Sequence, residues 1–234
     1  MPYYVSKAVA GPVLHMLWRP KVTGAENVPG SGGAIIASNH VSIMDSVFLP
    51  LMLRRPVTFP AKVEYFTGTR LIDRATAVYL RRTKMLSVDR SGARAGQEML
   101  EAALRLLRDG KLFGIYPEGT RSPDGRLYRG RTGVGWLALA SGLPVVPVAM
   151  IGTDRVLPPG RTLPHLGRVE VRIGKPLTFT ERSGGEARGS QSAKSRREAT
   201  DQVMQAIQAL SGQEYAPMYA SDRKSELAAR RASG

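Results

Sequence analysis

The sequence has no cysteine and only three histidines among its 234 residues. Without cysteine there can be no disulfide, no thiolate metal site and no cysteine nucleophile, and the composition suits a reducing compartment. His15, His40 and His165 do not have the spacing of metal ligands, so no bound metal is expected. The G-x-x-x-x-G-K-[ST] phosphate loop and the G-x-S-x-G turn of serine hydrolases are also missing. The sequence therefore does not predict metal-dependent catalysis, a cysteine nucleophile, a P-loop nucleotide site or a serine-hydrolase site.

Long apolar runs are scarce, and none reaches the roughly 20 residues that a membrane-spanning helix needs. The best candidate, Tyr3 to Trp18, contains Lys7 and Gly11-Pro12 and is followed by Arg19. No small-residue cleavage site follows it, so a signal peptide is not expected. An apolar helix edged by aromatic and basic residues is typical of the membrane interface. A helix that packs on its own domain fits the same residues.

Acidic residues are few, which leaves a net charge of +15. Residues 181–234 hold 9 Lys/Arg against 7 Asp/Glu, whereas residues 1–180 hold 25 against 12. The positive charge therefore belongs to the body of the chain and favours an anionic partner: nucleic acid, an acidic membrane surface or a phosphorylated substrate. Aromatic residues make up only 6% and no nucleic-acid motif is present, so no nucleic-acid partner is expected.

Short apolar runs alternate with helical patterns through the middle of the chain. The runs that predict strands are 34–38, 57–61, 85–88, 112–116, 144–151 and 169–173, the last with the alternation of an edge strand. The patterns that predict helices are 47–53, 91–107 and 132–141. This order predicts an α/β fold, a single domain with a mostly parallel central sheet flanked by helices, preceded by the N-terminal helical segment.

The composition also divides the chain. We expect a membrane-associating helix over 1–20, the α/β domain over 21–180 and a flexible Gly/Ser-rich loop over 181–195. A C-terminal helix over 196–212 and a disordered tail over 213–234 are expected to follow.

Polar groups follow three of the predicted strands directly: Asn39-His40, Asp89-Arg90 and Glu118 to Arg121. Because ligands of parallel sheets bind beyond the carboxyl ends of the strands, these groups are expected to converge at one edge.

His40 and Asp45 are the most informative pair. Residues five apart lie about 140° apart around a helix, so the two side chains can meet only if His40 precedes the helix that carries Asp45. Asp45 would then fix the tautomer of the imidazole, and the other ring nitrogen could remove a proton from a hydroxyl. The alternative is a capping turn, with Asn39 or Ser42 as the cap and His40 packed beside it.

A further motif is a false lead. Gly133 to Ala138 fits G-x-G-x-x-A and Asp154 follows about 20 residues later. The dinucleotide fingerprint requires a strand before the glycines, and the residues there are YRGRT.

Four segments resemble the glycerolipid acyltransferase family, which includes the bacterial 1-acyl-sn-glycerol-3-phosphate acyltransferases. They are NHVSIMD, LSVDRSG, YPEGTRS and LPVVPVAMI, in the order of the family's N-H-x-x-x-x-D, V-D-R, F-P-E-G-T-R-S and V-P-V blocks. The flanking VTGAENVP and FPAKVEYF agree, so the resemblance covers about residues 20–180. The chain departs from the family at Tyr116, where phenylalanine is usual, and at Leu86-Ser87; neither change is expected to touch a polar group.

The resemblance implies a role for each matching residue. His40 would be the general base on the acceptor hydroxyl and Asp45 its partner. Arg90 and Arg121 would hold the phosphate of the acceptor, helped by Lys62, because a guanidinium matches phosphate oxygens.

Glu118 and the turn Gly119-Thr120 would orient the glycerol backbone of the acceptor. Three of the binding residues also have a structural alternative: a salt bridge to Asp89 or a neighbouring loop for Arg90, a helix N-terminal carboxylate for Glu118, and a solvated side chain for Lys62.

The reaction implied by the resemblance moves a fatty acyl group from acyl-CoA or acyl-carrier protein to the sn-2 hydroxyl of 1-acyl-sn-glycerol 3-phosphate, giving phosphatidic acid for phospholipid synthesis. A thioester donor needs neither a cofactor nor a metal. The implied location is the cytoplasmic face of the cell membrane, peripheral or monotopic, on an anionic surface. Alternatives are another acceptor (a lysophospholipid, glycerol 3-phosphate or a glycolipid) and a catalytically silent membrane-binding relative.

Overall fold

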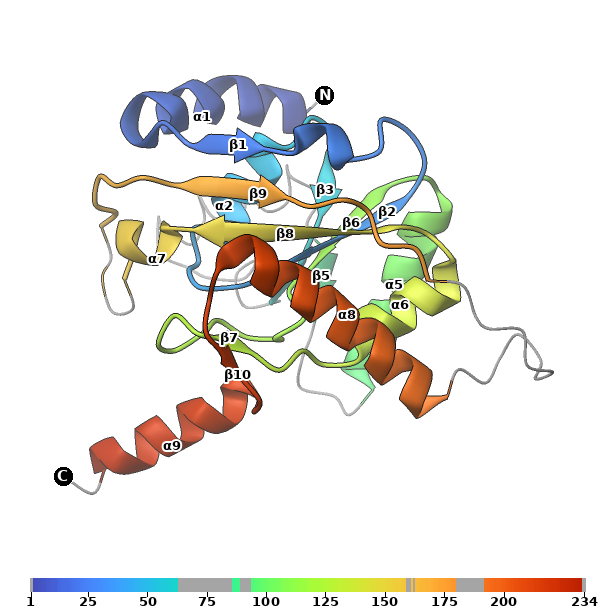
Figure 1. Ribbon diagram of the computed structural model, residues 1–234. Helices are drawn as coiled ribbons and strands as arrows, with labels where there is room; N and C mark the ends of the chain where they lie inside the picture. Colours follow the sequence, from blue (N-terminus) through green and yellow to red (C-terminus); the bar gives the residue numbers. More distant parts are fainter. Residues whose placement is uncertain are drawn as a thin grey trace.

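The computed structural model describes residues 2–62, 86–88, 94–158, 161, 163–179 and 192–232. Its centre is a six-stranded sheet in the order β1-β9-β8-β2-β6-β3 (Figure 1). The strands are β1 (Lys21–Thr23), β2 (Ala34–Ser38), β3 (Val57–Thr58), β6 (Leu112–Ile115), β8 (Val145–Ile151) and β9 (Glu170–Ile173). All neighbours are parallel except β8 and β9, so the predicted α/β fold with a mostly parallel sheet is confirmed.

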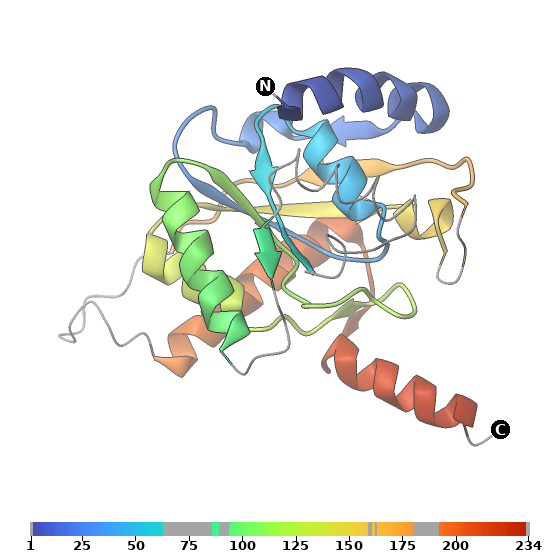
Figure 2. The same ribbon diagram turned by 180° about the vertical axis from the view of Figure 1, so that it is seen from behind.

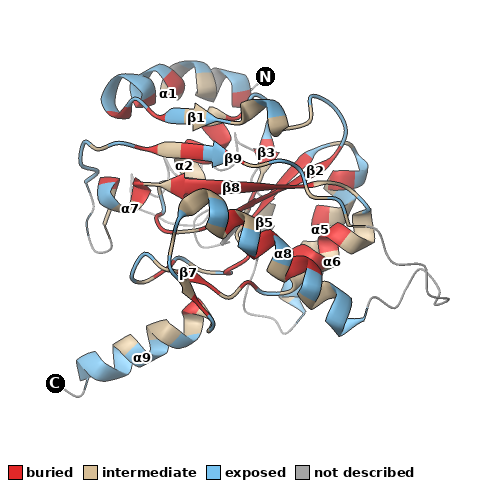
Figure 3. Cartoon of the chain, in the orientation of Figure 1, coloured by how far each residue is buried: buried red, intermediate tan, exposed pale blue. Residues whose placement is uncertain are grey.

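The central strands are almost entirely apolar because both faces of the sheet are covered, as is usual for parallel sheets. Every residue of β2 and β6 is buried, and Figure 3 shows β8 in red along most of its length. On one face, Ile36 packs with side chains of α1 (Pro2–Trp18) and α2 (Asp45–Met52). On the other face, Ile35 packs with side chains of α5 (Ala95–Arg108), α6 (Gly133–Ser141) and α8 (Ala193–Ser211). Figure 1 shows α8 crossing in front of the sheet, and Figure 2 shows α2 from behind.

The N-terminal helix α1 packs on the domain along one side only. The Tyr3 hydroxyl donates to the carbonyl of Pro50 at the end of α2, and Leu14 and Trp18 are buried in the core. Among the described residues, no helix combines the length and apolarity needed to cross a membrane.

The predicted edge strand at 169–173 is corrected. β9 lies inside the sheet, between β8 and β1, because the short segment Lys21–Thr23 adds a further parallel strand beyond it. The predicted strand at 57–61 is divided: β3 joins the main sheet, whereas β4 (Pro60–Lys62) pairs with β5 (Leu86–Val88) in a separate two-stranded sheet.

The tail predicted to be disordered over 213–234 is also corrected. It contains β10 (Tyr215–Ala216), which pairs with β7 (Leu127–Tyr128), and α9 (Ala220–Ala232). Ala216 and Ala220 are buried against Tyr128, a small apolar contact that holds the segment on the domain. The preceding helix α8 begins at Ala193 rather than at 196, with the Ser192 side chain capping its first turn. Most of the predicted loop, residues 181–191, lies outside the described residues.

Short elements complete the fold. They are the 3₁₀ helix η1 (Ala25–Asn27) and helix α7 (Thr153–Val156). The second of these follows β8 directly and contributes to the site described next.

Candidate active site

Three adjacent strands, β2, β6 and β8, end at the same edge of the sheet and each is followed by a polar side chain. His40 follows β2, Glu118 follows β6 and Thr153 follows β8. Two hydrogen bonds join the turns that carry the first two: the His40 N–H donates to the side-chain Oε1 of Glu118 (3.0 Å), and the Ser122 N–H donates to the His40 carbonyl (2.7 Å). The predicted convergence therefore occurs for His40 and Glu118. The third predicted group, Asp89-Arg90, lies outside the described residues.

His40 and Asp45 are in contact. His40 lies in the turn before α2, and Asp45 is the first residue of that helix. The distance between His40 Nδ1 and Asp45 Oδ2 is 2.9 Å. The imidazole is 15% exposed and the carboxylate 0% exposed. With Nδ1 held by the carboxylate, Nε2 is the ring nitrogen that can accept a proton.

The carboxylate of Asp45 is the most heavily hydrogen-bonded group of the site. Besides His40, the backbone N–H groups of Val41 and Ser42 donate to Oδ2, each at 2.8 Å. The Thr153 hydroxyl donates to Oδ1 at 2.5 Å. Donors around a buried carboxylate stabilise its ionised form. An ionised Asp45 in turn stabilises a protonated His40.

Thr153 was not anticipated from the sequence, although the same strand-end pattern points to it. Gly152 adopts φ 85°, turns the chain after β8 and begins α7, whose first residue is Thr153. Glycine adopts this left-handed conformation without the steric cost that other residues meet. The turn therefore places a buried hydroxyl against Asp45.

Tyr116 forms one wall of the site. Its ring stacks on the His40 imidazole, with centroids 3.9 Å apart and planes 9° apart, and it also stacks on Phe59. The Tyr116 hydroxyl hydrogen bonds to Ser46 Oγ at 3.1 Å. The expectation that this departure from phenylalanine touches no polar group is therefore wrong. Stacking fixes the plane of the imidazole, while the hydrogen bond to Asp45 fixes its rotation.

Glu118 is buried, at 1% exposure, and both of its oxygens accept backbone hydrogen bonds. Oε1 accepts from His40 and Oε2 from Tyr128 at 2.9 Å. Burial raises the pKa of Glu118 to about 7, against the lowering effect of the two backbone donors; the charge of Asp45 adds to the increase. A carboxylate occupied in this way positions the His40 turn. No helix begins at Glu118, so the helix N-terminal alternative is wrong, whereas its contact to a glycerol backbone stays a prediction.

The turn after Glu118 is open to solvent. Gly119 has φ 74°, Thr120 is half-buried and accepts a hydrogen bond from Lys224 Nζ (2.6 Å), and Arg121 is exposed. Lys62 ends β4, and its description extends only to the backbone. The structure therefore brings His40, Asp45 and the 118–121 turn together and does not place Arg90 or the Lys62 side chain.

Asn39 has a different role from the predicted cap. Its side-chain amide donates to the Met150 carbonyl (3.0 Å), and its side-chain oxygen accepts from the Met150 N–H (2.7 Å). The side chain thus continues the pairing of β2 with β8 past the last strand residue. Ser42 does bond to the turn, since its Oγ accepts from the Met44 N–H at 3.3 Å. The residue before α2 is Met44, however, and no side-chain capping hydrogen bond forms there, so neither Asn39 nor Ser42 is the helix cap.

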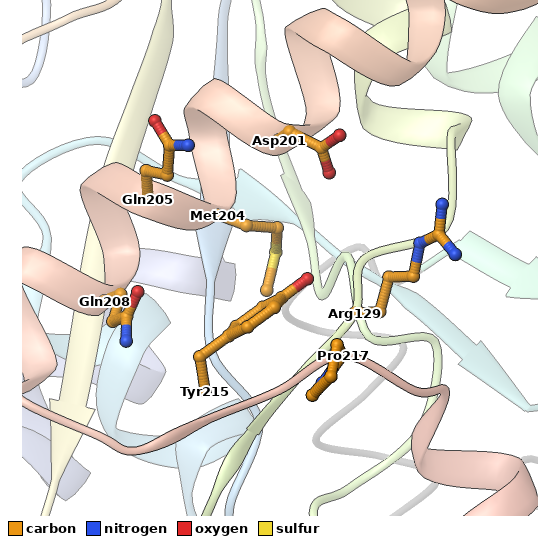
Figure 4. Close-up of a pocket in the computed structure, with 7 residues that line it drawn as sticks. All are labelled: Arg129, Asp201, Met204, Gln205, Gln208, Tyr215 and Pro217. Carbon is orange, nitrogen blue, oxygen red and sulfur yellow. The ribbon is translucent and has the colours of Figure 1, made fainter.

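Two hollows lie near the sheet edge. The larger, about 360 Å³, lies between α8 and Tyr215–Pro217, with Arg129 at one end (Figure 4). It contains none of the predicted site residues. The smaller, about 190 Å³, is lined by Val41 beside His40, by the Gly152 turn and by Gln213. Within the described part of the chain, no group of three or more His, Cys, Asp or Glu side chains could hold a metal ion.

The geometry agrees with comparisons to known proteins. The chain is 30% identical over 178 residues to the chloroplastic 1-acyl-sn-glycerol-3-phosphate acyltransferase LPAT1 of Arabidopsis thaliana, covering 75% of this chain and 48% of that one. It is 30% identical over 159 residues to the 1-acyl-sn-glycerol-3-phosphate acyltransferase of Bacillus subtilis, covering 67% of this chain and 73% of that one. The chain spans about half the length of the plant relatives that it matches.

The fold is similar to a solved structure as well. The crystal structure of the 1-acyl-sn-glycerophosphate acyltransferase PlsC of Thermotoga maritima matches with a TM-score of 0.65 and 26% identity, covering 89% of this chain and 78% of that one. The Acyltransferase family model matches residues 19–151, which include His40, Asp45, Glu118 and Arg121. This chain therefore belongs to the Acyltransferase family.

Proposed function

We propose that this protein transfers a fatty acyl group from a thioester donor, acyl-CoA or acyl-carrier protein, to the sn-2 hydroxyl of 1-acyl-sn-glycerol 3-phosphate. The observation that carries the proposal is the His40–Asp45 pair at 2.9 Å, beside the turn that carries Arg121. The names of the relatives from Arabidopsis and Bacillus support the choice of acceptor.

In the proposed reaction His40 Nε2 takes the proton of the acceptor hydroxyl while the hydroxyl oxygen attacks the thioester carbonyl. The new C–O bond forms, the C–S bond breaks, and the imidazolium returns the proton to the leaving thiolate. Asp45 stabilises the transient imidazolium, and Tyr116 keeps the ring in place. A base positioned in this way contributes about 10²–10⁴-fold to the rate.

Arg121 is the proposed partner of the acceptor phosphate, with Arg90 and Lys62 as further candidates from the family resemblance. The guanidinium of Arg121 is exposed at the turn after Glu118, where a ligand can reach it. Its planar donors suit the oxygens of a phosphate. Arg121→Ala is expected to raise KM for the acceptor and to leave KM for the acyl donor unchanged.

We further propose that α1 and the 163–166 segment rest on an anionic membrane surface at the cytoplasmic face. Met16 is 71% exposed, and Leu163 and Leu166 are 77% and 74% exposed. The two segments are joined because Trp18 Nε1 donates to the His165 carbonyl (2.7 Å). Exposed apolar side chains on a protein of net charge +15 suit an interface with acidic lipid.

Deleting residues 1–18 would remove core side chains, so surface substitutions test this attachment better. Met16→Asp combined with Leu166→Asp is expected to reduce co-sedimentation with phosphatidylglycerol vesicles. Ser225→Asp on exposed α9 adds negative charge elsewhere and is the control. Equal sedimentation of the double variant and the wild type would contradict the proposed membrane face.

The reaction itself is tested with purified full-length protein and labelled donors. Acyl-CoA and acyl-carrier protein are each supplied with 1-acylglycerol 3-phosphate, glycerol 3-phosphate, a lysophosphatidylcholine or monoacylglycerol. Labelled phosphatidic acid as the main product is expected. Transfer mainly to another acceptor would refute the proposed acceptor but not the proposed acyl-transfer reaction. No transfer to any acceptor would refute the whole proposal.

A further inference from the structure

The C-terminal segment lies against the turn that carries the proposed phosphate-binding residues. Lys224, on α9, donates from Nζ to Thr120 Oγ1 at 2.6 Å, and Thr120 precedes Arg121. This contact spans 104 residues of sequence and joins Thr120, inside the 19–151 region that the family model matches, to Lys224 outside it. The Lys224 ammonium group therefore lies next to the turn that carries Arg121.

The segment is anchored at several points, so the position of Lys224 is not set by one contact. β10 pairs with β7, and the Arg129 N–H donates to the Met218 carbonyl (3.0 Å). Arg131 stacks over Tyr219, 5.0 Å from the ring centroid, and donates to Ser221 Oγ (3.1 Å). These contacts hold the beginning of α9 on the domain, although the rest of the helix extends away from it (Figure 1).

The same segment reaches the turn that carries His40. Gln213 Oε1 accepts from the Asn39 side chain (2.7 Å), and Gln213 Nε2 donates to the Gly125 carbonyl (2.6 Å). Asn39 directly precedes His40. The C-terminal segment therefore contacts both the turn of the proposed base and the turn of the proposed phosphate ligand.

The charges at this place are unbalanced. Nearby arginines such as Arg126 and Arg223 each have a carboxylate within 4 Å, Asp124 and Glu226 respectively. Within the described ranges, no carboxylate forms a salt bridge with Lys224 or Arg121. Two cations next to each other without a carboxylate partner favour binding of an anion.

The electrostatics of Lys224 agree with this picture. Partial burial lowers its pKa, and the charge of Arg121 lowers it further, while Glu118 opposes the change. An added phosphate would offset the repulsion between Lys224 and Arg121.

We propose that Lys224 is a binding residue for the acceptor phosphate, so that the C-terminal segment completes the acceptor site beside Arg121. The inference rests on the proposed function, because a phosphorylated acceptor is what that function requires. Lysine acts on phosphate as a mobile point charge, and together with the planar arginine it would contact different oxygens of one phosphate. Lys224 would thus select acceptors with a phosphate at this position over those without one.

The test compares three full-length variants. Lys224→Gln removes the charge but keeps a donor for Thr120, Lys224→Arg keeps the charge, and Arg231→Gln removes one charge from an exposed position of the same helix. We expect Lys224→Gln to raise KM for 1-hexanoylglycerol 3-phosphate about tenfold, the lower range for a lost hydrogen bond to a charged group. Its kcat, its KM for the acyl donor and its melting temperature are expected to stay at wild-type values. Arg231→Gln is expected to stay close to wild type throughout, and Lys224→Arg, which keeps the charge, is expected to restore most of the acceptor affinity that Lys224→Gln loses.

An unchanged acceptor KM in Lys224→Gln would overturn the inference while leaving the proposed function intact. So would a loss of melting temperature together with equal losses for both substrates, because that pattern indicates a purely structural contact. If the wild type transfers no acyl group, the proposed function fails, and calorimetric binding of 1-hexanoylglycerol 3-phosphate then tests Lys224 by itself. Weaker binding by Lys224→Gln than by Arg231→Gln supports the inference, whereas equal or absent binding in all variants overturns it.

Discussion

Replacing Thr153 by valine removes one hydrogen bond from the buried Asp45 carboxylate while nearly keeping the shape of the side chain. Thr153 is 0% exposed, so neither the hydroxyl nor Asp45 Oδ1 can turn to bulk water in its place. Among the described residues, Thr153 is the side chain that donates to Oδ1, whereas the three other donors reach Oδ2. The valine variant therefore leaves one carboxylate oxygen buried without that donor.

An unsatisfied buried acceptor costs about 1–3 kcal/mol, and more when it carries charge. For a domain of this size each kcal/mol lowers the melting temperature by roughly 2–4 °C. Without this hydrogen bond, Asp45 should also stabilise the imidazolium of the transition state less well. If the activation free energy rises by about 1.4 kcal/mol, kcat falls about tenfold. KM for both substrates is expected to stay unchanged, because Thr153 bonds to Asp45 and not to the proposed ligand positions.

Thermal melts and steady-state acyl transfer measure the two effects. Thr153→Ser keeps the hydroxyl and is the control, with kcat expected near the wild-type value. Wild-type kcat and melting temperature in Thr153→Val would refute the conclusion that Thr153 supports Asp45.

Further predictions concern three neighbouring residues. Burial raises the pKa of Glu118 to about 7, so the folded protein holds a proton there that the unfolded chain releases near pH 4.5. The stability of the folded state should therefore fall as pH rises from 4.5 to 7. Glu118→Gln should flatten that part of the plot of melting temperature against pH, and an unchanged slope would contradict the raised pKa. Tyr116→Leu removes the stacking on the imidazole and should lower kcat roughly two- to tenfold, whereas Tyr116→Phe should retain activity; equal rates would exclude a role for stacking. Gly119→Ala forces a side chain into the left-handed region at φ 74° and should destabilise folding by about 1–2 kcal/mol in chemical denaturation, so an unaltered midpoint would argue against a strained turn.

The location of the site could be predicted from the sequence because two independent constraints agree. Because parallel strands end at one edge of a sheet, the sequence predicts that the turns carrying His40 and Glu118 lie close together. The five-residue spacing required His40 to precede the helix of Asp45, and the structure places that helix start at Asp45 itself. The same edge rule applied to the end of β8 would have identified Thr153, since Gly152-Thr153 follows an apolar strand in the same way as the other two groups.

Other features could not be read from local patterns. The segment YAPMYA over 215–220 is short and has neither helical nor strand periodicity, and its partner Tyr128 is distant in sequence, so the local pattern predicted disorder. The stacking of Tyr116 on His40 depends on the angle between two strand ends, which residue periodicity does not encode. The inner position of β9 depends on pairing with a three-residue strand whose sequence, KVT, carries almost no signal.

The central claim is that His40 is the base for acyl transfer to a phosphorylated acceptor. It is tested most directly by the rate of labelled phosphatidic acid formation from 1-acylglycerol 3-phosphate in wild type and His40→Ala, with folding checked by thermal melting. The account predicts a loss of about 10²–10⁴-fold in the variant, with the protein still folded. A folded His40→Ala protein that forms phosphatidic acid at the wild-type rate would contradict it.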